Sequence, residues 1–264
     1  MAGDLNEALL EMHYFRALVN YFKMELGETD FHVFKPTAGK ENWFGFDQAY
    51  FVSKESKAIA IKSIREYLSD RANYPYIIKA FFLQFKIVEK MQRKSGNMPA
   101  GWVTPYFRSE LSLKPNKQTG KSQHETLLLS ASIPQTKVLY ICPMIFEEDD
   151  IIRNPELDDL RMVDIQSAPV GWATNTSHHI CFQETDGDPF WCSKPTEGKA
   201  VELKGFLESI PELTIDEFES FIQKLFIALG QEARTNRIEN PLPFCMWVIA
   251  VPRKNQPRNL DMNT

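Results

Sequence analysis

The chain has 264 residues, of which 43% are hydrophobic and 25% charged, so it can bury a large core and is too apolar to be wholly disordered. Its formal net charge of −5 excludes nucleic-acid binding over the whole surface and leaves only local basic patches. Because it begins with no signal peptide and has no run as long as a membrane span, we expect a soluble cytoplasmic protein without a membrane partner.

Hydrophobic periodicity predicts a helix over residues 5–26, where apolar residues recur three and four positions apart. The run 76–88 predicts a central strand, because its apolar residues are too continuous for an edge, although its length also leaves a helix open. The remaining predicted elements are, in chain order, strands at 30–34 and 45–52, a helix at 53–68, a strand at 106–113, a helix at 123–132, a strand at 138–142, a helix at 149–160, strands at 162–165 and 180–184, a helix at 215–229 and a strand at 245–251.

This order of helices and strands predicts an α/β fold, with a mixed sheet flanked by helices. Two polar residues, Gln84 and Lys86, interrupt the apolar run 80–87. Alternation along a strand places both on one face, while their apolar neighbours point the other way. Because polar side chains cost free energy in a core, a functional role is the alternative to a purely structural one. Glu41 and Asp47 supply carboxylates, and a carboxylate, an amide carbonyl and an ammonium group together can hold a divalent cation and polarise a phosphate.

Asp47 followed by Gln84 and Lys86 resembles the motif of the PD-(D/E)xK restriction-endonuclease-like superfamily, in the variant of Mrr-type enzymes that carry Gln at the acidic position. Glu41 matches the additional acid that often precedes the Asp. The resemblance implies a restriction-endonuclease-like core over residues 1–195, with a C-terminal extension of helix and strand packed on the same domain. An uncharacterised bacterial family of this superfamily is similar in four segments: Phe82–Lys86, Pro105–Arg108, Gln123–Glu125 and Tyr140–Phe146. This similarity covers roughly residues 5–195 and leaves the extension over 196–264 unassigned.

The resemblance implies a Mg²⁺- or Mn²⁺-dependent endonuclease that hydrolyses DNA, with Asp47 and the Gln84 carbonyl as metal ligands and with help from Glu41. Lys86 would orient the attacking water or neutralise the charge that develops on the phosphate. Anti-phage defence, a partner subunit of a defence system and a homodimer are further expectations. The basic residues that we expect to contact DNA are Lys54, Lys57, Lys114, Lys117 and Lys121.

Several alternatives remain open at this point. The same fold can serve as a catalytically inactive module that binds nucleic acid or protein. Asp188, Glu202 and Lys204 form a rival set with the same kind of spacing, and Glu11 on the first helix is either a further acid at the site or a surface residue.

The cysteines predict no zinc module. Cys181 and Cys192 lie near the His178–His179 pair, but this spacing matches no common zinc site, so we expect reduced, buried thiols.

Overall fold

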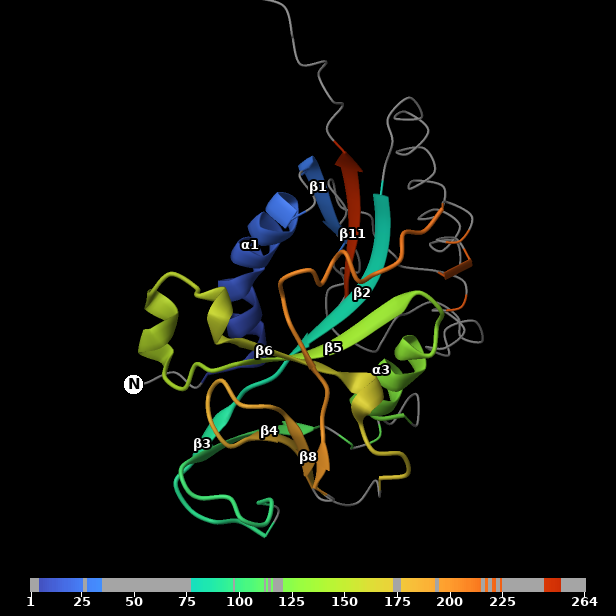
Figure 1. The fold of residues 1–264 in the computed structure, drawn as a ribbon. Coiled ribbons are helices and arrows are strands. Elements are labelled where there is room, and N and C mark those ends of the chain that lie inside the picture. The colour runs from blue at the N-terminus through green and yellow to red at the C-terminus, as the bar shows by residue number, and fades with distance from the viewer. Residues whose placement is uncertain are drawn as a thin grey trace, which may run out of the picture.

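Two β-sheets form the framework of the chain, which we describe from a computed structural model (Figure 1). Among the described residues, one sheet has six strands and the other has five, and the mixed α/β class expected from the sequence is confirmed. The structure describes residues 5–25, 28–34, 77–96, 98–111, 113, 115, 121–172, 177–192, 195–214, 217, 220–221, 224 and 245–252.

The six-stranded sheet has the order β1-β11-β2-β5-β6-β10. Its two inner strands β2 and β5 are parallel, and the other neighbouring pairs are antiparallel. Since β2 lies between β11 and β5, the predicted central strand is confirmed and the competing helix is wrong. The strands are β1 (Glu28–Phe34), β2 (Ile77–Phe85), β5 (Thr136–Pro143), β6 (Leu160–Asp164), β10 (Ala200–Val201) and β11 (Cys245–Pro252).

Helix α1 (Glu7–Glu25) covers one face of this sheet, which confirms the helix predicted over 5–26. Every fourth residue along its inner side is fully buried, which places one apolar stripe against the strands. Phe22 meets Phe81 of β2 at 5.6 Å between ring centroids. The buried residues that share this core include Leu10, Tyr14, Leu18 and Phe22 of α1, Phe81, Leu83 and Phe85 of β2, and Leu139 and Ile141 of β5.

The opposite face of β2 and β5 packs against helix α3 and the five-stranded sheet. The ring of Tyr140, which alternates with the α1-facing residues of β5, lies 6.0 Å from His124 of α3 and 6.3 Å from Trp191 of β8. The molecule is therefore layered, with β2 and β5 between α1 and this second layer (Figure 1). The elements are α3 (Gln123–Ala131) and, in sheet order, β3 (Glu89–Met91), β4 (Tyr106–Leu111), β7 (His178–Phe182), β8 (Phe190–Cys192) and β9 (Thr196–Glu197).

The predicted helix over 149–160 is wrong. The structure has two 3₁₀ helices there, η1 (Glu148–Ile152) and η2 (Leu157–Asp159), and a third, η3 (Ile165–Ser167), follows β6. Pro155 explains the interruption, because proline lacks the N–H that a helix interior needs and disfavours the helical conformation of Asn154 before it. Two predicted elements, 45–52 and 53–68, lie outside the described residues, and the described residues within 215–229 are helical.

The last described strand, β11, pairs with both β1 and β2, so residues near the end of the chain lie inside the six-stranded sheet. Ala80 of β2, for example, is in register with Trp247 of β11. Residues 196–264 thus contribute strands to the sheet that carries Gln84, whereas their division from residues 1–195 stays a prediction.

Candidate active site

Lys86 lies just past the end of β2 and is only 3% exposed. Its backbone N–H donates to the Ile141 carbonyl at 2.8 Å, which holds the residue against β5. The ammonium group donates to Glu7 Oε1 at 2.7 Å and to Gln123 Oε1 at 2.8 Å. The lysine side chain is 4% exposed and that of Glu7 is 40% exposed, so the lysine of this ion pair is buried and the glutamate is partly exposed to solvent.

Gln84 closes a ring of four side chains, which we call the Lys86 cluster: Glu7, Gln84, Lys86 and Gln123. Its Nε2 donates to Glu7 Oε2 at 3.3 Å, and its Oε1 accepts from Gln123 Nε2 at 3.2 Å. One consistent direction runs through these bonds, because the ammonium can only donate and the carboxylate can only accept. Gln123 therefore turns its side-chain oxygen to Lys86 and its NH₂ group to Gln84. The NH₂ group of Gln84 in turn donates to Glu7.

Two helix starts bring the cluster together. Glu7 is the first residue of α1, where the Asn6 side chain accepts from the Leu9 N–H at 2.9 Å and caps the helix. Gln123 is the first residue of α3, whose N-cap Ser122 forms a capping box with Glu125. The N-termini of both helices, which carry partial positive charge, thus lie beside Lys86. Lys86 and the two helix N-termini supply positive charge here, and the carboxylates of Glu7 and Glu125 in the first turns of the helices oppose it.

An imidazole and a phenol pack behind the cluster. His124 Nδ1 and Tyr140 Oη are hydrogen-bonded at 2.9 Å, and Tyr140 is in register with Gln84. Burial lowers the pKa of His124 to about 4, with further contributions from His178 and Lys86. Burial also raises the pKa of Tyr140 well above its ordinary value. Both groups are therefore neutral near pH 7.

The proposed metal ligands are only partly described. Asp47 and Glu41 lie outside the described residues, and Gln84 is the predicted ligand that the structure places. Within the described ranges, no group of three or more His, Cys, Asp or Glu side chains is arranged to hold a metal ion. Sequence reasoning missed Glu7 and named Glu11 instead, which is one turn further along α1 and 2% exposed. Glu11 is buried, so the expectation that it is a surface residue is wrong.

The predicted DNA-contacting lysines mostly fall outside the described part of the chain: Lys54, Lys57, Lys114 and Lys117. Lys121 is half-buried. It directly precedes Ser122, the N-cap of α3, and therefore lies two positions before Gln123.

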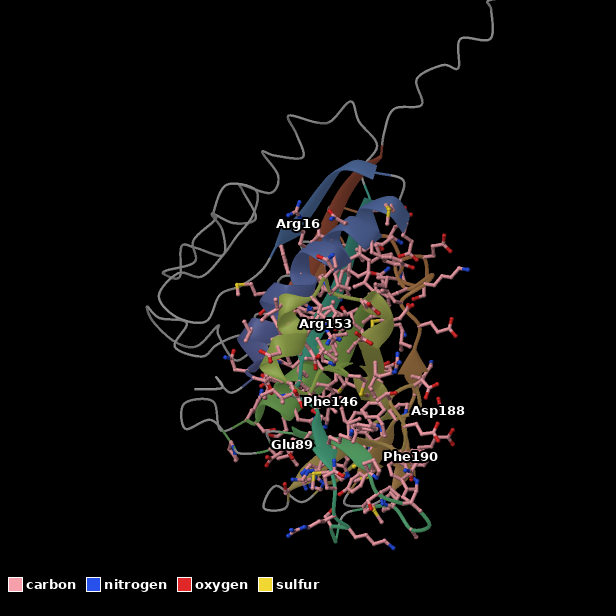
Figure 2. The ribbon with its side chains drawn as sticks, turned by 90° about the vertical axis from the view of Figure 1, so that its left-hand side faces the viewer. Arg16, Glu89, Phe146, Arg153, Asp188 and Phe190 are labelled. Carbon is pink, nitrogen blue, oxygen red and sulfur yellow. The ribbon has the colours of Figure 1, made fainter. Side chains whose placement is uncertain are left out.

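The rival set is not built on one strand. Asp188 precedes β8 of the five-stranded sheet, whereas Glu202 and Lys204 follow β10 of the six-stranded sheet. All three side chains are exposed, and Asp188 lies at the margin of the molecule (Figure 2). No buried strand holds them as it holds Gln84.

Comparisons with known proteins do not identify the chain: no family model, curated protein or solved structure matches it. Among the helices that the structure describes, none combines the length and the apolar character required to cross a membrane.

Proposed function

We propose that this protein is a metal-dependent nuclease that hydrolyses DNA phosphodiester bonds at the Lys86 cluster. The supporting observation is the buried ammonium of Lys86, bonded to Glu7 and Gln123 where two helices begin. A phosphate entering this place would meet the ammonium group and the positive ends of two helix dipoles. Such preorganised positive charge stabilises the negative charge that develops during phosphoryl transfer.

The strand directions support a restriction-endonuclease-like core as part of the proposal. β1, β2 and β5 run in one direction, because β11 is antiparallel to both β1 and β2, and β2 is parallel to β5. A helix precedes β1, and α3 lies between β2 and β5 in the chain. This mixed sheet, with a helix on each face and the glutamine–lysine pair at the end of a central strand, fits the sequence resemblance.

The donor set fits a hard divalent cation. Glu7 offers a carboxylate and Gln84 an amide oxygen, and we assign Asp47 and Glu41 to complete the set. When bound, Mg²⁺ or Mn²⁺ would acidify a water and neutralise charge on the phosphate. Gln84 Oε1 accepts from Gln123, so a cation and Gln123 compete for this oxygen.

The residues of the cluster have distinct roles in this proposal. Lys86 presents its ammonium group to the phosphate, and Glu7 compensates that charge while the site is empty of substrate. Gln123 fixes the direction of the Lys86 side chain through its 2.8 Å hydrogen bond. The contacts with DNA on either side, from Lys54, Lys57, Lys114, Lys117 and Lys121, and a role in anti-phage defence follow from the sequence resemblance.

A second function, a catalytically inactive module that binds nucleic acid or protein, is favoured by a different observation. The bonds of Lys86 join the start of α1 to the start of α3, so the ammonium is already engaged within the fold. Under this alternative the ion pair fixes the relative position of two helices, and substitutions there change stability without any associated chemistry.

The two functions are separated by incubating supercoiled plasmid, linear duplex, single-stranded DNA and RNA with the protein and Mg²⁺ or Mn²⁺. Nuclease action predicts cleavage of DNA that EDTA stops and that Asp47→Ala and Glu7→Gln both abolish while the circular dichroism spectrum is unchanged. Failure of the wild-type protein to cleave any of the four substrates contradicts the nuclease and favours the binding module. Cleavage that survives both substitutions places the chemistry elsewhere.

A further inference from the structure

A group of sulfur-bearing side chains gathers on the outer face of the five-stranded sheet, away from the Lys86 cluster. In the pairing of β7 with β8, Cys192 lies opposite His179, and Cys181 lies opposite Phe190. All four side chains therefore share one face, with the two cysteines on adjacent strands and diagonal to each other. Cys181 is 1% exposed and Cys192 is 0% exposed, and both are free thiols.

Two thioethers complete the group, which we call the sulfur cluster: Cys181, Cys192, Met91 and Met98. Met91 of β3 and Met98 of the loop before β4 both pack against the buried cysteines and Tyr106. Trp102 covers the same cluster, and its ring lies 5.3 Å from that of Phe190, which Figure 2 labels on this sheet. The Tyr106 hydroxyl holds the loop in place through a 2.7 Å hydrogen bond with Ser95. The two buried thiols thus lie beneath partly buried apolar side chains.

The charged and titratable groups around the sulfur cluster suit a cationic ligand with thiolate bonds. Arg108 is directly opposite Cys181 in the pairing of β4 with β7, and it also binds Glu89 at 2.9 Å. His179 is 4% exposed, and within the described part of the chain its Nδ1 has no hydrogen-bond partner.

Without a ligand, the Cys192 thiol donates a weak hydrogen bond to the Phe190 carbonyl at 3.7 Å. A metal ion would replace the proton of each thiol.

We propose that Cys181 and Cys192 bind a copper(I) ion, with the thioether of Met98 as an additional ligand. Soft thiolate and thioether ligands select Cu(I), whereas Mg²⁺ and Ca²⁺ take oxygen ligands and a structural zinc site takes four nitrogen or sulfur ligands. On binding, two S–H bonds break, two S–Cu bonds form and both protons leave to solvent. Copper remains Cu(I), and Arg108 balances the single negative charge of the bis-thiolate complex.

The site is independent of the proposed nuclease. The sulfur cluster lies on the outer face of the five-stranded sheet, whereas the Lys86 cluster lies at the end of β2 in the other sheet. A site of two thiols and thioethers also differs from a group of three or more His, Cys, Asp or Glu ligands, which the described residues do not form.

The test is an anaerobic titration of the reduced full-length protein with Cu(I) in competition with the coloured chelator bathocuproine disulfonate. We expect wild type to withdraw one equivalent of Cu(I) and to gain an ultraviolet thiolate-to-copper charge-transfer band. Cys181→Ala together with Cys192→Ala should lose both signals. The matched control, Cys142→Ala together with Cys245→Ala, keeps the sulfur cluster and should retain both.

Met98→Leu, which nearly conserves volume, should weaken Cu(I) binding by about 10-fold without affecting the fold, and it serves as a test if the cysteine variants do not fold. X-ray absorption of the loaded protein should show sulfur ligands on copper. Three results would overturn the proposal: wild type leaves all Cu(I) with the chelator, copper remains bound after the Cys181 and Cys192 substitutions, or Met98→Leu leaves the affinity unchanged. The cluster would then serve only to pack the apolar face of the sheet.

Discussion

Two buried lysines near opposite ends of β2 have different surroundings. Lys79, near the start of β2, is 4% exposed and donates to the Ile210 carbonyl at 2.7 Å. Lys86, beyond the other end, is 3% exposed and donates to a carboxylate and an amide. A lysine bound to a backbone carbonyl anchors a segment of chain, whereas a lysine bound to polar side chains is part of a group that can exchange partners. Burial alone therefore does not distinguish an anchor from a site.

The charge balance also differs between the two ends of β2. Burial lowers the pKa of Lys79, and the charges of Glu212, Glu208 and Glu25 act to raise it. At the other end, the Glu7 carboxylate is in direct contact with the Lys86 ammonium. The protein thus supplies a compensating anion at Lys86 and a neutral acceptor at Lys79.

The largest stability effect should come from pH at the Lys86 end. The pKa of His124 falls from 6.5 to about 4 in the folded protein, so between these values the unfolded chain binds a proton that the folded chain does not. Stability should therefore fall as pH is lowered from 6.5 towards 4, by at most about 3 kcal/mol from this residue. Urea unfolding at pH 7 and pH 4.5 measures the loss. His124→Phe should reduce it, and an equal pH dependence in wild type and variant would contradict the assignment.

Glu7→Ala should destabilise the protein by about 2 kcal/mol, because it leaves the Lys86 ammonium buried without its carboxylate. The expected loss is smaller than for a fully buried pair, since the Glu7 side chain is 40% exposed and water can reach the site. Chemical denaturation at pH 7 measures it. Glu89→Gln, which removes the exposed partner of Arg108, is the matched control and should cost under about 1 kcal/mol. Equal losses in the two variants would mean that Lys86 needs no compensating anion.

Ser122→Ala should cost about 1 kcal/mol, because it removes the cap that starts α3 and presents Gln123 to Lys86. Ser132→Ala, at the other end of the helix, has no N-cap role and should change stability less. Thermal unfolding of both variants gives the comparison, and a larger loss in Ser132→Ala would contradict the role of the capping box.

Lys79→Met should be nearly neutral, within about 1 kcal/mol, because losing the hydrogen bond to Ile210 is offset by removing a buried charge. Methionine keeps the apolar stem of the lysine. Urea unfolding at pH 7 measures the change. A loss above about 3 kcal/mol would show that Lys79 also belongs to a charged network and would remove the contrast with Lys86.

The sequence could predict the framework because the relevant patterns are long. The helix over 5–26 has enough turns to show its period, and the run 76–88 has enough apolar residues to identify an inner strand. The five-stranded sheet was harder to predict, since β3 and β8 have three residues each and such segments show no periodicity. The break at Pro155 was visible in the sequence, and the predicted helix over 149–160 overlooked it.

Only part of the candidate site could be predicted. Gln84 and Lys86 were recognisable because polar residues stand out in an apolar strand. Glu7 and Gln123 were not, because each stands at the start of a helix, where polar residues are ordinary, and only the folded chain brings them to the end of β2. Contacts across 77 or 79 positions of sequence, such as those of Glu7, depend on how the layers pack.

The most direct test of the Lys86 cluster as an active site is the rate of Mg²⁺-dependent DNA cleavage by Lys86→Met and Lys79→Met. Each variant replaces a buried lysine of the same chain segment by methionine, and both are compared with wild type after circular dichroism confirms that they are folded. We predict that Lys86→Met cleaves about 10²- to 10³-fold more slowly, because it removes the charge that would stabilise the reacting phosphate, while Lys79→Met cleaves at the wild-type rate. Wild-type cleavage by Lys86→Met, or equal losses in both variants, would contradict the proposed site.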